Sequence, residues 1–511
     1  MTTAADRVLT NAEVHTLTDP DETYEAVAIR DGEVVRLDST YEIEFLVGVD
    51  TDVVDCGGRT VIPGFVDAHT HMQQLGQYQV HADLSGAGSV DEAVETLESD
   101  AKDDGDWLLG FGWDESEWDE PRYLTRDDLD RVSDDRPVAA VRVDMHTAAL
   151  NSVALDRLAD AMPDEDVRTD AGEPTGVVVE DAVEPVWDAI DPDPAETREL
   201  LTAAGDYAHR HGVTCVHDMV RESHAPRVYR DLDLDDELDL RVRINYWSDH
   251  LDAVREAGLR TNHGSEFVEV GAIKSFTDGS FGGRTAKLSD SYADAEGETG
   301  TWVVDPDELR DIVDEADAAG LQCTVHAIGG EAVEETLSAF EATEDPGAAR
   351  HRVEHVELAT DEHVERFAET GIVASCQPNF LQWAQEGGLY DQRLGEERRR
   401  RSNRYRDLLD AGVHLAFSSD VMPMDPLLGV SYAASAPSEH QRLTVTEALR
   451  AYTLGGAYAG FDEDRMGTVA VGKKADLAVL EESPWDGDAE AIRDIDVAMT
   501  VVDGEVVYDA R

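Results

Sequence analysis

The sequence predicts an α/β protein built around a (β/α)8 barrel (TIM barrel), with a satellite β-sandwich formed by the N- and C-terminal segments and a large insertion after strand 1. Three observations predict this fold. Eight short apolar runs alternate with helical patterns, both chain ends carry hairpin signatures, and one long segment interrupts the alternation. The chain of 511 residues also exceeds the roughly 250 to 300 residues at which one core stops growing. We therefore expect a composite sandwich of residues 1–60 and 466–511 and a barrel of residues 61–465, including an inserted cap region at 73–205.

The two chain ends share a hairpin pattern. EAVAIRDGEVVRLDS places two alternating apolar runs around Asp31-Gly32, and VAMTVVDGEVVYDAR repeats the pattern around Asp503-Gly504. An Asp-Gly pair between alternating runs favours a tight hairpin turn. The segment 467–481 adds further strand-like residues. We expect both ends to join one small β unit.

The middle of the chain shows the alternation of strands and helices that is typical of a parallel barrel. Helical patterns such as DPDELRDIVDEADAAG lie between near-continuous apolar runs, and strands buried on both faces have this composition. The long segment after the first run is rich in Trp, Asp and Gly and is interpreted as an insertion, in the position of a substrate-side cap. The predicted strands are 61–69, 212–219, 241–247, 271–278, 322–328, 352–358, 371–378 and 414–420.

Acidic residues dominate the composition. The chain has 42 lysines and arginines against 112 aspartates and glutamates, a formal net charge of −70. Nucleic acid and anionic membranes would repel such a chain, so we expect neither as a partner. The acids are spread along the sequence, which indicates a solvated acidic surface. Because concentrated salt screens self-repulsion of this size, the composition predicts a halophilic protein with the acidic character of a high-salt cytoplasm.

The remaining composition also favours a cytoplasmic protein. The first residues, MTTAADRVLT, lack an export signal, and no run approaches the ~18 apolar residues of a membrane span. Four cysteines, Cys56, Cys215, Cys323 and Cys376, are scattered without CxxC pairing. This spacing fits neither a disulfide framework nor a zinc ribbon, so we expect buried thiols.

Two histidines mark the end of the first predicted barrel strand. In VIPGFVDAHTHM, His69 and His71 occupy alternate positions just where the apolar run stops. Residues i and i+2 of a strand face the same side, so both rings can reach one point, which is chelating geometry. Two histidines satisfied by carbonyl groups near a strand end are the alternative.

Four further polar residues approach the carboxyl ends of predicted strands. Lys274 lies on the fourth, His326 on the fifth, His355 on the sixth and Asp420 at the end of the eighth. Barrel enzymes do their chemistry on this face. Taken singly, His326 could be a core histidine, His355 a partner of Glu354 or Glu357, and Asp420 a helix cap. Six such groups on one face favour a shared site.

Lys274 is one of only five lysines, and it lies within the apolar stretch AIKSF. A buried lysine amine has a lowered pKa, which leaves it neutral and nucleophilic. Such an amine can take up carbon dioxide and become a carbamate able to bridge two metal ions. The alternative is a lysine paired with Asp278 or with a substrate carboxylate.

Three other residues are candidates for binding substrate. Arg284, in DGSFGGRTA, offers a guanidinium fork for a carboxylate or carbonyl, with a structural ion pair as the alternative. His146 and Asn151 lie in the inserted segment and either line a pocket or order the cap.

The chain resembles the amidohydrolase superfamily, specifically its type 3 (YtcJ-like) branch, which includes N-substituted formamide deformylases and AepA-like proteins. The resemblance runs in family order over nearly the whole chain. Its motifs are VIPGFVDAHTHM, GFGWDESEW, RVDMHTAALNSVAL, GEPTGVVVEDAV, GVTCVHDM, IKSFTDGSFGGRTA, VHAIGGEAV, HRVEHVEL, FSSDVMPMDPLLGV and the segment from TVTEALRAYTLGG to DLAVL.

The resemblance implies a metal centre with one or two divalent ions, usually zinc. His69 and His71 would bind the more buried metal and His326 and His355 the second, while Asp420 would touch the first metal and the attacking hydroxide. In one alternative, a carbamylated Lys274 bridges two metal ions. In the other, the site is mononuclear and Lys274 or Glu180 has another role. Many relatives have Trp after the catalytic Asp, whereas this chain has Val421 and Met422.

The activity implied is hydrolysis, by a metal-bound hydroxide, of a non-peptide C–N bond in a small-molecule N-acyl or N-formyl amine or cyclic amide. Asp420 and Lys274 are the expected catalytic residues, and a homodimer is one expected assembly. Two alternatives are a deaminase of the same superfamily, which the lysine on strand four disfavours, and a non-catalytic binding or regulatory relative, which would be expected to have lost ligands.

Overall fold

The computed structural model describes residues 4–102, 105–118 and 120–511. The chain forms two compact units, one made of the residues up to His71 and from Gly205 onward, the other of Met72–Ala204. Across the described ranges, no helix is both long enough and apolar enough to span a bilayer.

The first unit contains the predicted barrel. Eight parallel strands pair in one sheet, in the order in which the chain makes them. The barrel closes through the residues that follow the last strand. There the Asp420 N–H donates to His69 O, on the first strand, at 2.9 Å. The barrel strands are β8 (Phe65–Thr70), β15 (Val213–Val220), β16 (Arg241–Trp247), β17 (Val268–Phe276), β18 (Gln322–Ala327), β19 (Arg352–His355), β20 (Val373–Cys376) and β21 (Leu415–Phe417).

The first predicted strand, 61–69, is in fact two strands. β7 (Thr60–Pro63) belongs to a terminal sheet, and β8 begins after Gly64. A Cβ atom at Gly64 would lie 2.3 Å from the Thr214 side chain, so only glycine fits where the chain passes from one sheet to the other. The apolar run continues across this point, which is why the sequence predicted a single strand.

Several of the helices that follow barrel strands bury an apolar stripe. In α10 (Pro306–Ala318), Leu309, Val313 and Ala316 are buried, and Asp305 caps the first turn by accepting the Asp307 N–H. The other helices of this unit are α1 (Thr40–Ile43), α8 (Ala225–Leu234), α9 (Leu251–Glu256), α11 (Gly330–Glu341), α12 (Pro346–Ala349), α13 (Asp361–Thr370), α14 (Leu389–Arg400), α15 (Tyr405–Asp410), α16 (Pro426–Ser435), α17 (Val445–Arg450) and α18 (Gly456–Ala459). Helix α7 (Pro194–Arg210) precedes β15.

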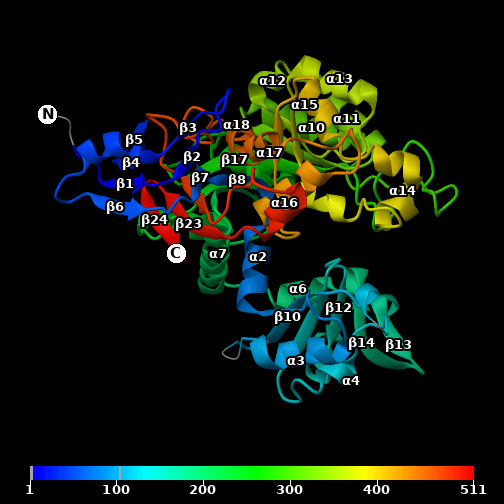
Figure 1. The fold of residues 1–511 in the computed structure, drawn as a ribbon. Helices are drawn as coiled ribbons and strands as arrows, with labels where there is room; N and C mark the ends of the chain where they lie inside the picture. Colours follow the sequence, from blue (N-terminus) through cyan, green and yellow to red (C-terminus); the bar gives the residue numbers. More distant parts are fainter. Residues whose placement is uncertain (1–3, 103–104, 119) are drawn as a thin grey trace. The chain divides into compact units, whose positions relative to one another are not determined.

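The two chain ends form two β-sheets that share one core. One sheet has the order β5-β4-β1-β6 and the other β24-β23-β22-β7-β2-β3, and the N-terminal strands lie beside β23 and β24 (Figure 1). Both predicted hairpins are present, with positive φ at Asp31-Gly32 and at Asp503-Gly504. Side chains from both sheets, including Val27 and Met499, pack in the same cluster. The strands are β1 (Arg7–Thr10), β2 (Glu13–His15), β3 (Thr23–Tyr24), β4 (Ala26–Arg30), β5 (Glu33–Asp38), β6 (Asp52–Asp55), β22 (Leu477–Leu480), β23 (Val497–Val502) and β24 (Glu505–Asp509).

The inserted unit has its own mixed sheet, in the order β13-β14-β12-β11-β10-β9. Its two faces carry separate apolar clusters, one around Phe111 and the other around Trp113. Its strands are β9 (Ala82–Asp83), β10 (Leu108–Trp113), β11 (Val138–Arg142), β12 (Thr147–Leu150), β13 (Val167–Asp170) and β14 (Glu173–Val179), and its helices are α2 (Met72–Val80), α3 (Val90–Asp100), α4 (Arg126–Leu129), α5 (Ser152–Leu158) and α6 (Glu184–Ala189).

Candidate metal centre

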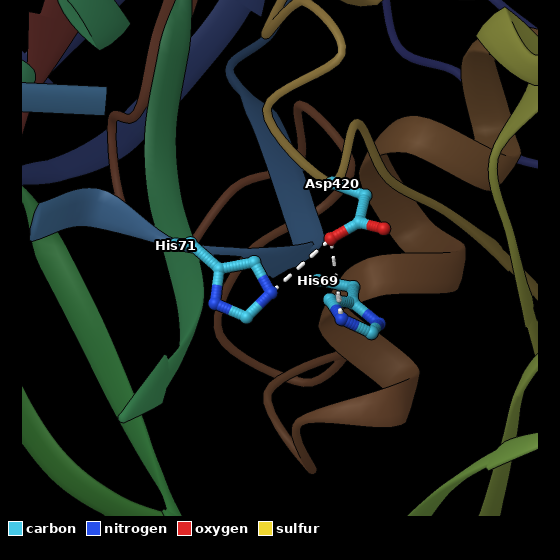
Figure 2. A group of neighbouring side chains, drawn as sticks. All are labelled: His69, His71 and Asp420. Carbon is cyan, nitrogen blue, oxygen red and sulfur yellow. Dashed lines mark ion pairs between the residues drawn. The ribbon is translucent and has the colours of Figure 1, made fainter. Parts of the chain in front are cut away.

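His69, His71 and Asp420 converge at the carboxyl end of the barrel (Figure 2). Asp420 Oδ1 lies 3.2 Å from His71 Nε2 and 3.6 Å from His69 Nε2. One ligand atom from each of the three residues lies within 4.8 Å of the others. The alternation expected from the sequence therefore brings both rings to one carboxylate.

The backbone around Asp420 turns its carboxylate inward. Asp420 and Val421 have φ angles of 54° and 61°, a left-handed conformation that is uncommon for residues other than glycine. The Asn379 side chain donates to Ser419 O at 2.8 Å and to Met422 O at 2.7 Å. Asp420 is not the cap of the next helix, since Asp425 accepts the Leu428 N–H at the start of α16.

His355 and His326 extend the cluster. The His355 ring centroid lies 5.1 Å from that of His69 and 4.4 Å from that of His326. His355 Nδ1 contacts Gln377 Oε1 at 2.7 Å, and His326 Nε2 contacts Gly279 O at 3.1 Å. Each ring therefore has one nitrogen oriented by an acceptor, which leaves the other nitrogen to act as a ligand.

Burial keeps these histidines neutral. It lowers the pKa of His69 to about 3 and that of His355 to about 4, and it lowers the pKa of His326 well below the ordinary value. Burial raises the pKa of Asp420, but the neighbouring His69 and His71 outweigh burial and hold that pKa below its usual range. Neutral imidazoles and an ionised carboxylate are the protonation states that bind a divalent metal.

Lys274 is fully buried beside this cluster. Burial lowers the pKa of its amine to about 8. Among the described residues its Nζ atom has no hydrogen-bond partner, and it lies 4.8 Å from the centre of the Phe276 ring. The predicted alternative partner, Asp278, instead accepts backbone N–H groups from Lys287, Ile328 and Gly329 at 2.7 to 3.0 Å.

The Arg284 guanidinium forms an ion pair with Asp294 at 2.8 Å, as the alternative of a structural ion pair predicts. Glu357, one alternative partner of His355, instead accepts a hydrogen bond from the Tyr390 hydroxyl.

The predicted residues of the inserted unit serve local structure or face solvent. The Asn151 side chain caps α5 by accepting the Ala154 N–H at 2.9 Å, and it also bonds the backbone of Ser133, Arg136 and Val138. The His146 side chain is 74% exposed and lies 3.8 Å from Glu180.

The sequence interpretation missed the residue that contacts His69. Glu354 Oε2 lies 2.8 Å from His69 Nδ1, whereas the sequence suggested Glu354 as a partner of His355. A signal was present in HRVEHVEL, where Arg352 and Glu354 occupy alternate positions of a buried strand. Two opposite charges pointing to one side of a buried strand indicate a buried ion pair.

The histidine and carboxylate donors fit a divalent metal ion, and a barrel with such a centre at its carboxyl end is typical of metal-dependent hydrolases. The chain belongs to the amidohydrolase family, whose sequence model matches residues 52–508. It is a hydrolase of carbon–nitrogen bonds other than peptide bonds.

Known proteins resemble the chain over almost its whole length. It is 31% identical to the YtcJ protein of Bacillus subtilis (strain 168), over 97% of this chain and 98% of that protein. It is 26% identical to the N-substituted formamide deformylase of Arthrobacter pascens, over 100% and 99%. A crystal structure of an uncharacterized metal-dependent hydrolase from Pyrococcus horikoshii OT3 matches with a TM-score of 0.81 and 29% identity, over 94% of this chain and 99% of that one. These matches confirm the predicted branch and the barrel.

Proposed function

We propose that the protein is a divalent-metal-dependent amidohydrolase that cleaves an N-acyl or N-formyl amine or a cyclic amide, with its metal centre at His69, His71 and Asp420. The convergence of these three donors at the carboxyl end of the barrel carries the proposal. His326 and His355, whose rings continue the cluster, would supply donors for a second ion. Zinc is the metal that this donor set favours.

Asp420 is the proposed proton carrier. When bound, a divalent metal would polarise the carbonyl group of the substrate and lower the pKa of a nearby water molecule. The Asp420 carboxylate would take the proton from the attacking water and deliver it to the leaving nitrogen, which departs as an amine. Asp420 Oδ1 lies 3.2 Å from His71 Nε2, so the carboxylate is within reach of an ion that His71 would hold.

The substrate class rests on the relatives. The Arthrobacter relative is named an N-substituted formamide deformylase and matches end to end, which supports a formyl or acyl amine as the group cleaved. Val421 and Met422 follow Asp420, and Met422 is partly exposed, so we expect the part of the substrate beyond the amide to differ from that of relatives with Trp there.

The test combines metal analysis with a substrate screen. Protein purified with Zn2+ should hold one or two equivalents by mass spectrometry, and a screen of N-acyl and N-formyl amines in high salt should find an activity that a chelator removes and Zn2+ restores. His71→Ala should lose metal, whereas the control His440→Ala, which removes a histidine paired with Asp407 at 3.0 Å, should retain it. A wild type that holds no metal would overturn the proposal.

We also propose that Lys274 carries a carbamate. Its buried amine with a pKa of about 8 is neutral in an appreciable fraction of molecules at neutral pH. The nitrogen attacks carbon dioxide, an N–C bond forms, and one proton leaves to solvent, which yields an anion with two ligand oxygens.

Two substitutions test the carbamate. Lys274→Ala should lose metal and activity together, and bicarbonate with a short carboxylic acid should restore both. Lys274→Arg should fail as well, because its guanidinium cannot form the carbamate. An active Arg variant would exclude the carbamate and leave the histidine–aspartate centre as proposed.

A further inference from the structure

A buried polar chain runs from His69 away from the metal centre. Glu354 Oε2 lies 2.8 Å from His69 Nδ1, and Glu354 Oε1 accepts a hydrogen bond from Arg352 Nε at 2.7 Å and another from the Thr324 hydroxyl. His69, Glu354 and Arg352 are each at most 1% exposed. Both carboxylate oxygens of Glu354 are therefore occupied, one of them by the imidazole.

The guanidinium of Arg352 links the Glu354 carboxylate on β19 to two other strands, β8 and β15. Besides its bond to Glu354, Arg352 donates from Nη2 to Ala68 O at 2.6 Å, next to His69 on β8. Its Nη1 lies 2.7 Å from His217 Nδ1 on β15. Since a guanidinium only donates, this nitrogen of His217 is the acceptor. Arg352 thus holds the backbone beside His69 and the carboxylate that contacts the His69 ring.

The backbone is distorted at the end of β19, next to Glu354. Successive residues of a strand face opposite sides, yet both Glu354 and His355 contact or approach the His69 ring. His355 and Val356 have φ angles of 73° and 51°, a left-handed conformation that is uncommon for residues other than glycine and strained for the β-branched Val356. The strained residues lie where two adjacent side chains must serve one centre.

A comparison within the protein separates this ion pair from a structural one. Arg241 and Asp476 also form a buried pair, 2.7 Å apart, between the start of β16 and the residue before β22. That pair contacts no histidine of the cluster. A buried ion pair is weak evidence for stability, because an apolar pair of similar size is often equally stable. The distinguishing feature of Arg352–Glu354 is its contact with a candidate ligand.

We propose that Glu354, held in place by Arg352, is the positioning residue of His69. Glu354 accepts the proton of His69 Nδ1, which leaves the lone pair on Nε2, the nitrogen that faces Asp420. It thereby fixes the tautomer and ring direction, and its negative charge makes the imidazole a stronger ligand. This inference rests on the proposed metal centre, and it assigns Glu354 no contact with substrate.

The test removes the pair in two ways that both keep the charge balanced. Glu354→Leu with Arg352→Met leaves His69 Nδ1 without its acceptor. Glu354→Gln with Arg352→Met keeps an acceptor oxygen without the charge. Arg241→Met with Asp476→Asn is the matched control. The measurements are Zn2+ affinity by chelator competition, the visible absorption spectrum of the Co2+ form, and the melting temperature of the metal-free protein.

The Leu/Met variant should bind Zn2+ about 10- to 100-fold more weakly, the usual effect of losing a partner of a metal-bound histidine, with a changed Co2+ spectrum. The Gln/Met variant should recover part of the affinity. The control should keep wild-type affinity and spectrum even if its melting temperature falls.

The outcomes distinguish this inference from the proposed function. Wild-type metal affinity and spectrum in the Leu/Met variant would overturn the positioning role alone. So would a Gln/Met variant no better than Leu/Met, or an equal loss of affinity in the control. A wild type that binds neither Zn2+ nor Co2+ would overturn the proposed function and this inference together.

Discussion

The inserted unit and the unit that contains the barrel use their acidic residues differently. Residues 72–204 hold 35 of the 112 acidic residues and 9 of the 42 basic ones, a net charge of −26 over 133 residues. The other 378 residues carry −44, so the inserted unit is more acidic per residue. In the barrel unit, the partly buried Asp420 and the fully buried Glu354 each contact a histidine of the cluster. The more densely charged unit is therefore not the one that contains the candidate metal centre, which lies in the barrel unit.

Asp420→Asn should produce the largest effect. The substitution preserves size and one ligand oxygen but removes the basicity needed to accept a proton from water. We expect most of the metal to be retained while kcat falls by roughly 10² to 10⁴, the usual contribution of general acid–base catalysis, with KM much less changed. Metal analysis and steady-state kinetics on a substrate from the screen provide the measurement. A near wild-type kcat would remove Asp420 from the mechanism.

Asn151→Ala should affect stability and leave the chemistry intact. The Asn151 side chain caps α5 and bonds the Val138 N–H at 3.0 Å. Loss of a cap costs about 1 kcal/mol and an unsatisfied buried N–H about 1–3 kcal/mol, so we expect a loss of about 2–4 kcal/mol in denaturant unfolding. At temperatures where the variant is folded, kcat/KM should equal that of wild type. A selective rise in KM would instead return Asn151 to the substrate site.

The sequence predicted the barrel strands and the strand-end residues because both depend on local patterns. Apolar runs, helical periodicity and the positions of His69, Lys274 and Asp420 can be read without knowing which strands pair. The break at Gly64 depends on its approach to Thr214, a contact between residues distant in sequence. The approach of His355 to the same His69 ring that Glu354 contacts coincides with a positive φ at His355, which the residue type does not indicate. Asn151 shows the converse, since Asn directly before the helical segment SVALDRL was a readable cap signal.

A buried histidine of the barrel unit should make stability depend on acid pH. Burial lowers the pKa of His351 to about 4, while its Nδ1 accepts the Cys323 N–H at 3.0 Å. The unfolded chain, with an ordinary pKa near 6.5, binds the proton more readily than the folded one. Stability is therefore lost as pH falls from about 6.5 toward about 4, by about 1.4 kcal/mol per pH unit.

His351→Asn keeps an acceptor for Cys323 and removes the titration. The variant should be less stable than wild type at pH 6.5, and this difference in unfolding free energy should shrink by about 1.4 kcal/mol per pH unit as the pH falls to about 4. Denaturant titrations of both proteins at several pH values measure this difference. A deficit that stays constant with pH would show that His351 protonates equally in both states.

Salt should stabilise the inserted unit more than the barrel unit. Of the effects predicted here, this difference between the two units is expected to be the smallest. Raising KCl from about 0.1 M to about 1 M shortens the Debye length from about 10 Å to about 3 Å, which screens repulsion among exposed acids. Both units should become more stable, and we expect the whole protein to melt many degrees higher. Because residues 72–204 carry −26 in 133 positions, their mutual repulsion per residue is stronger, and screening should stabilise them more.

Hydrogen exchange of the full-length protein, resolved by peptide, reports each unit separately. Protection in β10–β12 should rise by a larger factor than protection in β15–β18. An equal rise in both would mean that local charge density does not set the response, and a flat response in both would remove the inference that this chain works in concentrated salt.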